Sequence, residues 1–202
     1  NFFGNTHYAI EDMALMRSIP GMTILSPSDA GQAAKALIAA LTIDGPVYIR
    51  HTGTLNCPIV YNDEYTFEVG KSIQVKDGKD ITIFATGSMV NNSLKAAKLI
   101  EDLGLSVKVI DMHTIKPLDK ETIKKCSSSV LFVSVEEHNI IGGLGTAISE
   151  YLSCEHNLPP LLRLGVMDKF SHPGDYLYLL EQNRLMPPEI AEDILKMYNS
   201  IA

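Results

Sequence analysis

The chain has 202 residues, of which 46% are hydrophobic and 20% charged, as in soluble globular proteins with a substantial core. A net charge of −7 and the lack of a long apolar run argue against a nucleic-acid-binding surface, an anionic-membrane-binding surface or a membrane span. Three widely spaced cysteines, Cys57, Cys126 and Cys154, form no CxxC pair, which disfavours a disulfide framework or a zinc site and indicates a reducing cytoplasm.

The first 65 residues predict only two helices and two short strands. Ser28 or Asp29 can cap the second helix by accepting hydrogen bonds from its free N–H groups. So few elements rarely bury enough surface to be stable alone. We therefore interpret residues 1–65 as the second half of a larger α/β domain whose first half is missing. The predicted helices are 9–17 and 30–41, and the predicted strands are 22–25 and 47–50.

Residues 51–66 resemble a linker, and a regular alternation of strands and helices follows them. Asp77-Gly78 is a hairpin turn signal between the first two strands of this part. Residues 66–202 are expected to form a complete small α/β domain. Its predicted strands are 67–75, 81–85, 107–110, 130–135 and 161–164, and its predicted helices are 89–103, 119–125, 142–152, 176–182 and 188–198.

The predicted strands are apolar on both faces, which is typical of parallel sheets covered by helices on both sides. The expected fold class is therefore α/β, with three layers and mostly parallel sheets.

Two residues are candidates for binding or catalysis. His7 lies in a loop at the entrance to the first helix, where an imidazole can transfer protons, although such a histidine is more often a surface or capping residue. Arg50 ends a predicted strand, and ligands of open α/β sheets gather at the carboxyl ends of strands. An arginine there can bind a phosphate or carboxylate through two parallel hydrogen bonds, or it can form a structural ion pair with the domain's own carboxylates.

A glycine-rich segment, Gly142-Gly143-Leu144-Gly145, follows the run Val135-Glu136-Glu137-His138 at the end of a predicted strand. Such a loop can bind phosphate at a helix N-terminus, but the spacing is not GxGxxG and the acidic residues would repel phosphate. A packing turn is the favoured interpretation. Side chains alternate along a strand, so at most Glu136 and His138 share a side, and metal binding by this run is disfavoured.

Several motifs resemble the transketolase family, in order along nearly the whole chain. The run from Thr6-His7 to Arg17, then Ile19-Pro20-Gly21-Met22, Ser26-Pro27-Ser28-Asp29 and Gly45-Pro46-Val47-Tyr48-Ile49-Arg50, is similar to the second half of the pyrimidine-binding domain. Thr86-Gly87-Ser88, Ile115-Lys116-Pro117-Leu118-Asp119 and Val135-Glu136-Glu137-His138 are similar to the last domain of the family.

The resemblance implies a reaction and a role for each candidate. Family members transfer two-carbon ketol units between sugar phosphates with thiamine diphosphate, in the pentose phosphate pathway. His7 would be the catalytic histidine that contacts the sugar near the reacting carbon, and Arg50 would bind the substrate phosphate. One position departs from the family: Phe3 stands where members commonly have an aspartate that contacts a sugar hydroxyl.

The resemblance also implies missing parts. The complete enzyme would hold thiamine diphosphate with Mg or Ca through a Gly-Asp-Gly motif and would activate it with a glutamate, and both lie before residue 1 in the family. No Gly-Asp-Gly occurs in this chain. We therefore expect no cofactor-binding or metal-binding residues here, an inactive fragment, and a partner that is the N-terminal half or a separate N-terminal subunit, within a homodimer.

Two alternatives remain open from the sequence. Deoxyxylulose-phosphate synthases share the Thr-His and the Ile-Lys-Pro-Leu-Asp-like stretch. A non-catalytic subunit or regulatory module could also keep this fold, and Phe3 favours that interpretation, whereas His7 together with Arg50 favours an enzyme.

Overall fold

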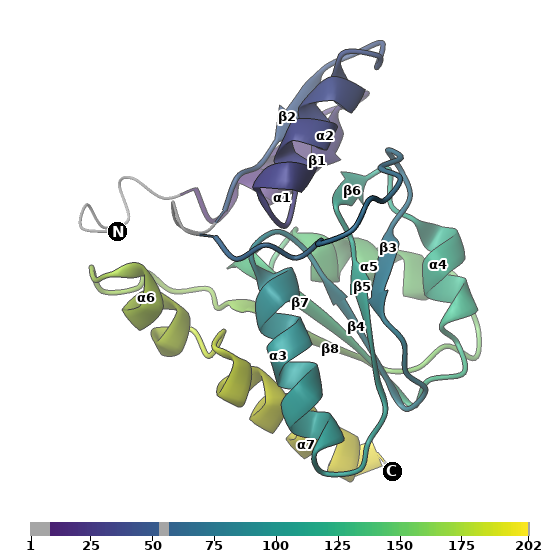
Figure 1. The fold of residues 1–202 in the computed structure, drawn as a ribbon, viewed down its shortest axis with the longest axis vertical. Coiled ribbons are helices and arrows are strands. Elements are labelled where there is room, and N and C mark those ends of the chain that lie inside the picture. The colour runs from purple at the N-terminus through teal and green to yellow at the C-terminus, as the bar shows by residue number, and fades with distance from the viewer. Residues whose placement is uncertain (1–8, 53–56, 202) are drawn as a thin grey trace.

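A computed structural model describes residues 9–52 and 57–201 of the chain (Figure 1). The N-terminal part contains α1 (Asp12–Ser18), β1 (Thr23–Leu25), α2 (Ala30–Ala40) and β2 (Val47–Ile49), close to the predicted bounds. Asp29 caps α2, because its side chain accepts a hydrogen bond from the backbone N–H of Gln32. β1 and β2 pair in parallel.

A five-stranded sheet forms the centre of the C-terminal part, in the order β3-β5-β4-β7-β8. Only β3 is antiparallel to its neighbour, so the expected mostly parallel α/β fold is confirmed. The strands are β3 (Ile73–Lys76), β4 (Ile81–Ala85), β5 (Val107–Asp111), β7 (Leu131–Asn139) and β8 (Leu161–Val166), and the helices are α3 (Met89–Glu101), α4 (Lys120–Lys125), α5 (Leu144–Leu152), α6 (Tyr176–Gln182) and α7 (Pro187–Ile201).

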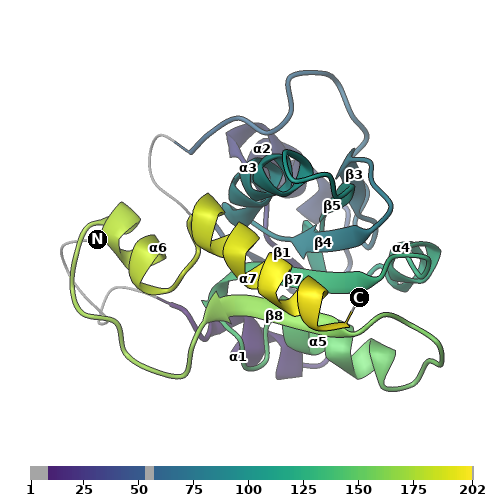
Figure 2. The ribbon, with the colours of Figure 1, turned by 90° about the horizontal axis from the view of Figure 1, so that it is seen from below.

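The central strands are apolar on both faces because each face has its own core. Ile81, Ile83 and Ala85 point into a core that contains residues of α3 and α7, two helices that pack side by side (Figures 1 and 2). Phe84 and Phe132 point into the opposite core, which residues of α1, α4 and α5 complete. Burial on both faces is what makes these strands continuously hydrophobic.

The predicted hairpin at Asp77-Gly78 is wrong. β3 and β4 are not neighbours, because β5 lies between them and pairs with both. Gly78 instead allows a close backbone approach: a Cβ at this position would lie 2.2 Å from the carbonyl carbon of Val107. The glycine is therefore required by packing against β5 and not by a two-residue turn.

A short strand, β6 (Thr114–Lys116), was not predicted and joins the two parts of the chain. It pairs antiparallel with β1, so the smaller sheet has the order β2-β1-β6. The N-terminal elements lie over one end of the larger sheet (Figure 1). Backbone hydrogen bonds link them to residues that follow β4 and β5, from Gly87 N–H to Ser26 (3.2 Å) and from Ser26 N–H to His113 (2.8 Å). The carboxyl ends of the parallel strands are thus covered by the N-terminal part.

Among the residues that the structure describes, no helix combines the length and apolar character that crossing a membrane requires.

Candidate functional site

Arg50 follows β2 and forms a buried ion pair. Its Nε lies 2.8 and 2.9 Å from the two carboxylate oxygens of Asp12, and both side chains are only 7% exposed. Its Nη2 donates to the backbone carbonyls of Ala9 and Glu137, each at 2.9 Å. Of the two interpretations left open by the sequence, the structural ion pair is present. Within residues 9–52 and 57–201, Nη1 has no hydrogen-bond partner.

Asp12 occupies the first position of α1 and links it to β2. Besides Arg50, it accepts a hydrogen bond from the Tyr48 hydroxyl at 2.8 Å. Burial, together with this bond to a carboxylate, raises the pKa of Tyr48 to about 12, so the phenol stays protonated as a donor. An acidic side chain in the first turn also interacts favourably with the helix dipole.

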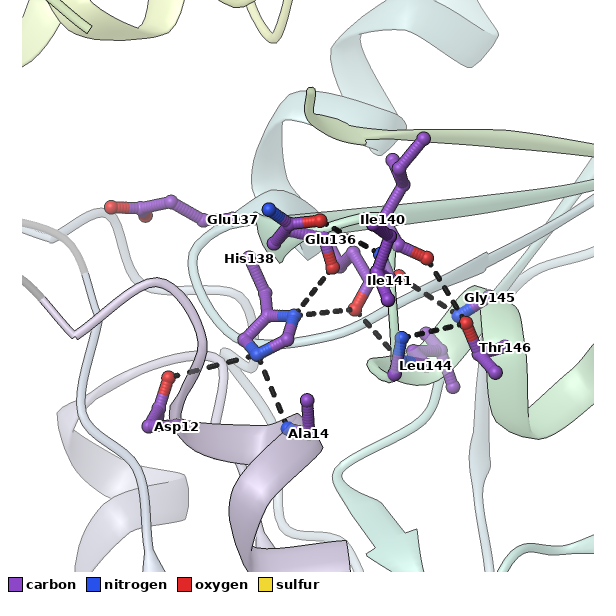
Figure 3. A network of polar contacts seen from close by, with 12 residues as sticks. Asp12, Ala14, Glu136, Glu137, His138, Ile140, Ile141, Leu144, Gly145 and Thr146 are labelled. Carbon is purple, nitrogen blue, oxygen red and sulfur yellow. Dashed lines mark hydrogen bonds and ion pairs between the residues drawn. The ribbon is translucent and has the colours of Figure 1, made fainter. Parts of the chain in front are cut away.

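Glu136 and His138 lie on the same side of β7, as strand alternation predicts, and Figure 3 shows them together beside α1 and α5. His138 Nδ1 lies 2.6 Å from the carbonyl oxygen of Asn139, and Nε2 lies 3.4 Å from the backbone N–H of Ala14. A carbonyl can only accept and an N–H can only donate, so the ring is neutral with its proton on Nδ1. Burial, with the nearby Arg50 charge, lowers the pKa of His138 to about 4, which agrees with a neutral ring.

Glu136 occupies the N-terminus of α5. Its two carboxylate oxygens accept hydrogen bonds from the backbone N–H groups of Leu144 (2.7 Å) and Gly145 (2.8 Å) (Figure 3). A Cβ on Gly143 would lie 1.9 Å from one of these oxygens, so the glycine is needed for the close approach. The N–H groups that could have bound a phosphate are occupied by the protein's own carboxylate. The glycine-rich segment is therefore a packing turn, as favoured from the sequence.

Burial raises the pKa of Glu136 to about 7, although the two backbone donors oppose the shift. In the described part of the chain, no three His, Cys, Asp or Glu side chains come together in a group that could hold a metal ion.

A second polar cluster surrounds Asp111, at the end of β5. One carboxylate oxygen accepts hydrogen bonds from Ser28 (3.0 Å), Gln32 (2.9 Å) and Tyr61 (2.6 Å). The other oxygen is buried without a partner among the described residues. Burial raises the pKa of Asp111 to about 6 despite these hydrogen bonds. This cluster was not predicted, because its members are far apart in the chain, and only the predicted cap at Ser28 or Asp29 pointed to the region.

His7 and Phe3 lie outside the described residues, so their predicted roles remain predictions. The described chain begins at Ala9, whose carbonyl is bound by Arg50. The structure therefore places Arg50 beside Ala9, the first residue that it describes. It also brings Asp12, Glu136 and His138 to the same region, which sequence analysis did not predict for Asp12.

Comparison with known proteins assigns the chain to a family. Residues 70–190 match the sequence profile of the transketolase C-terminal domain. The chain belongs to the transketolase family. Residues 2–57 match the profile of the transketolase pyrimidine-binding domain, so the family resemblance seen in the motifs is confirmed for both parts.

Curated transketolase-family proteins align along most of this chain. It is 38% identical, over 96% of its length, to a putative transketolase C-terminal section from Methanocaldococcus jannaschii. It is 41% identical, over 93%, to the 6-deoxy-6-sulfo-D-fructose transketolase subunit SqwH of Clostridium sp. strain MSTE9. It is 35% identical, over 98%, to a 1-deoxy-D-xylulose-5-phosphate synthase from Caldanaerobacter subterraneus. The chain spans 61%, 58% and 32% of the lengths of these relatives.

Solved structures agree with this assignment. A structure described as a split-gene transketolase, inactive β4 tetramer, superposes with a TM-score of 0.86 at 36% identity, covering 98% of this chain and 64% of that one. The transketolase from Campylobacter jejuni superposes with a TM-score of 0.72 at 18% identity, covering 96% of this chain and 29% of that one, and shows the shared fold.

Proposed function

We propose that this chain is the C-terminal section of a thiamine-diphosphate-dependent enzyme that transfers two-carbon ketol units between sugar phosphates. The observation on which the proposal mainly rests is the 38% identity, over nearly the whole chain, to a putative transketolase C-terminal section. The sequence resemblance to the family at His7 and Arg50 supports the same reaction.

Thiamine diphosphate, with Mg or Ca, supplies the carbanion chemistry of this reaction when it is bound in the complete enzyme. The described residues do not fit the diphosphate end of the cofactor. The backbone N–H groups at the α5 N-terminus are bound to Glu136, and the described residues include no group suited to a metal ion. We therefore assign the diphosphate and metal sites to a partner section, and we derive no step through the cofactor.

The partner in this proposal is the N-terminal half of the enzyme, on a separate polypeptide or on the same one. Support comes from the names of the relatives, which include a C-terminal section and a transketolase subunit. A structure of one split-gene relative is described as an inactive β4 tetramer, which fits a section that needs its partner for activity. A homodimer of complete units in the cytoplasm, acting in sugar-phosphate metabolism, is part of the same proposal.

The roles proposed for this chain concern the substrate. His7 contacts the sugar near the reacting carbon, and Arg50 binds the phosphate. The ion pair with Asp12 is compatible with this role, because Nη1 has no partner among the described residues and can donate to a phosphate oxygen. The buried pair would then fix the orientation of the guanidinium.

A deoxyxylulose-phosphate synthase is the second candidate, favoured by 35% identity over 98% of the chain to such an enzyme. Product analysis with the completed enzyme separates the two reactions, because one transfers a ketol unit between sugar phosphates and the other forms a deoxyxylulose phosphate.

Titration calorimetry tests the proposal. The chain alone, with Mg²⁺, should show no micromolar binding of thiamine diphosphate, because the contacts to metal and diphosphate are the strongest ones and belong to the partner. The chain mixed with its N-terminal section should bind the cofactor and turn over sugar phosphates. Micromolar binding by the chain alone would contradict the division of the site, and a completed protein without turnover would contradict the activity.

A further inference from the structure

The last three residues of β7, Glu137, His138 and Asn139, which we call the β7 anchor, contact the N-terminal part through two backbone groups and one side chain. The carbonyl of Glu137 accepts from Arg50 at 2.9 Å. The backbone N–H of Asn139 donates to the carbonyl of Ile10 at 2.8 Å. The ring of His138 accepts from the N–H of Ala14 at 3.4 Å. A strand of the C-terminal domain thus contacts both the segment that begins α1 and Arg50, the residue that follows β2.

α1 depends on such external contacts. It has only seven residues, and Glu11 at its N-cap makes no side-chain hydrogen bond to the free N–H groups of the first turn. A helix this short is not stable by itself, so its position is set by what it packs against. His138 supplies, from another domain, the acceptor that a capping residue would normally provide (Figure 3).

Two features fix the His138 acceptor, and contacts with Gly142 fix α1 itself. The Nδ1–H of His138 donates to the carbonyl of Asn139, so the lone pair of Nε2 is left to accept from the N–H of Ala14. The ring is fully buried. At the other end of α1, Arg17 donates to the carbonyl of Gly142 at 2.7 Å, and a Cβ on Gly142 would lie 2.4 Å from that of Ala14. The turn between β7 and α5 therefore contacts α1 along its length, leaving it little freedom to shift.

We propose that His138 is a positioning residue of the reaction, which sets the place of α1 and, through Asp12 of that helix, the orientation of the phosphate-binding Arg50. This rests on the proposed function for the role of Arg50. Ala9 and Asp12 are bound by Arg50, and Ile10 is bound by the β7 anchor. The C-terminal domain thereby acts on the chemistry without contacting the substrate.

Two substitutions of His138 distinguish a role of its hydrogen bond to α1 from a role of its side-chain volume alone. In His138→Gln, the amide oxygen can reach the place of Nε2 and accept from Ala14. In His138→Leu, the side chain stays buried and of similar size but has no acceptor. Both variants are to be assayed in the complete enzyme, formed by this chain and its N-terminal section. His138→Leu should lower kcat about 10- to 100-fold, because small displacements of reacting groups have effects of this size.

His138→Gln should restore kcat to within about threefold of the wild type, because glutamine keeps a hydrogen-bond acceptor for α1 that leucine lacks. General destabilisation by a substitution at this position would not give such a rescue. The KM for thiamine diphosphate should be unchanged in both variants, because the partner section holds the diphosphate in the proposed division of the site. Equal kcat values for His138→Leu and the wild type, or equal losses in both variants, would overturn the proposal.

Hydrogen exchange of the isolated chain gives a readout that does not need activity. The N–H of Ala14 should exchange faster in His138→Leu than in the wild type, and His138→Gln should restore its protection. Unchanged exchange at Ala14 in His138→Leu would overturn the proposal. If the wild-type complete enzyme shows no turnover, the proposed function fails, whereas the exchange comparison still decides whether His138 fixes α1.

Discussion

Replacing Asp12 by alanine should destabilise the chain strongly, because Arg50 would remain buried without its counter-ion. Both side chains are 7% exposed, and the carboxylate also accepts from Tyr48. Removing one partner of a buried ion pair costs about 3–5 kcal/mol of unfolding free energy. Since Arg50 keeps the carbonyl acceptors of Ala9 and Glu137, we expect the lower end, about 3 kcal/mol.

Urea unfolding followed by far-ultraviolet circular dichroism, at one protein concentration, measures this cost. The control is Glu121→Ala, which breaks the solvent-exposed pair with Lys71 and should cost far less, because solvent screens such pairs. The double variant Asp12→Ala/Arg50→Met should recover much of the lost stability, since it removes the uncompensated charge. The reasoning is refuted if Asp12→Ala costs no more than the exposed control.

Three other substitutions test the buried polar groups. Gly143→Ala should lower the unfolding midpoint in urea, because its Cβ would lie 1.9 Å from a carboxylate oxygen of Glu136; an unchanged midpoint would mean that the turn can shift freely. Burial lowers the pKa of His113 to about 4, so its neutral form favours folding above pH 6.5, and that stability is lost as pH falls toward 4. His113→Phe should therefore lose on the order of 2–3 kcal/mol less than the wild type between pH 7 and pH 4, measured by urea unfolding, and parallel curves would contradict this. Asp111 has its pKa raised to about 6 by burial, so its contribution to stability is lost as pH rises from about 4 to 6. Asp111→Asn should gain stability relative to the wild type over that range, and a constant difference would exclude the shift.

Local patterns predicted most elements, and long-range pairing explains the exceptions. β4 and α6 have the predicted bounds, because apolar runs and capping residues are local signals. β6 was missed because three residues have no readable periodicity, and its partner β1 lies about 90 residues earlier in the chain. The wrong hairpin has the same cause, since Asp77-Gly78 is a valid turn signal that cannot reveal β5 between the two strands.

The site was predictable to a similar extent. Strand alternation placed Glu136 and His138 on one side of β7, and the end of a predicted strand placed Arg50 at the carboxyl edge. Their partners could not be predicted from spacing: Asp12 is 38 residues from Arg50, and Ala14 is 124 residues from His138. Buried polar groups need partners, but sequence patterns do not identify them.

The pairing of β1 with β6 has a consequence for recombination between members of the family. A crossover placed in the linker would combine β1 from one parent with β6 from another. The two strands would then have to pair although neither comes from a protein that contains the other. Ile24 opposite Lys116 and Leu25 opposite Thr114 are the pairs that would have to match. Chimeras should be tolerated best when residues 23–25 and 114–116 come from the same parent. The two strands should therefore be exchanged together, and a crossover in the linker alone would separate them.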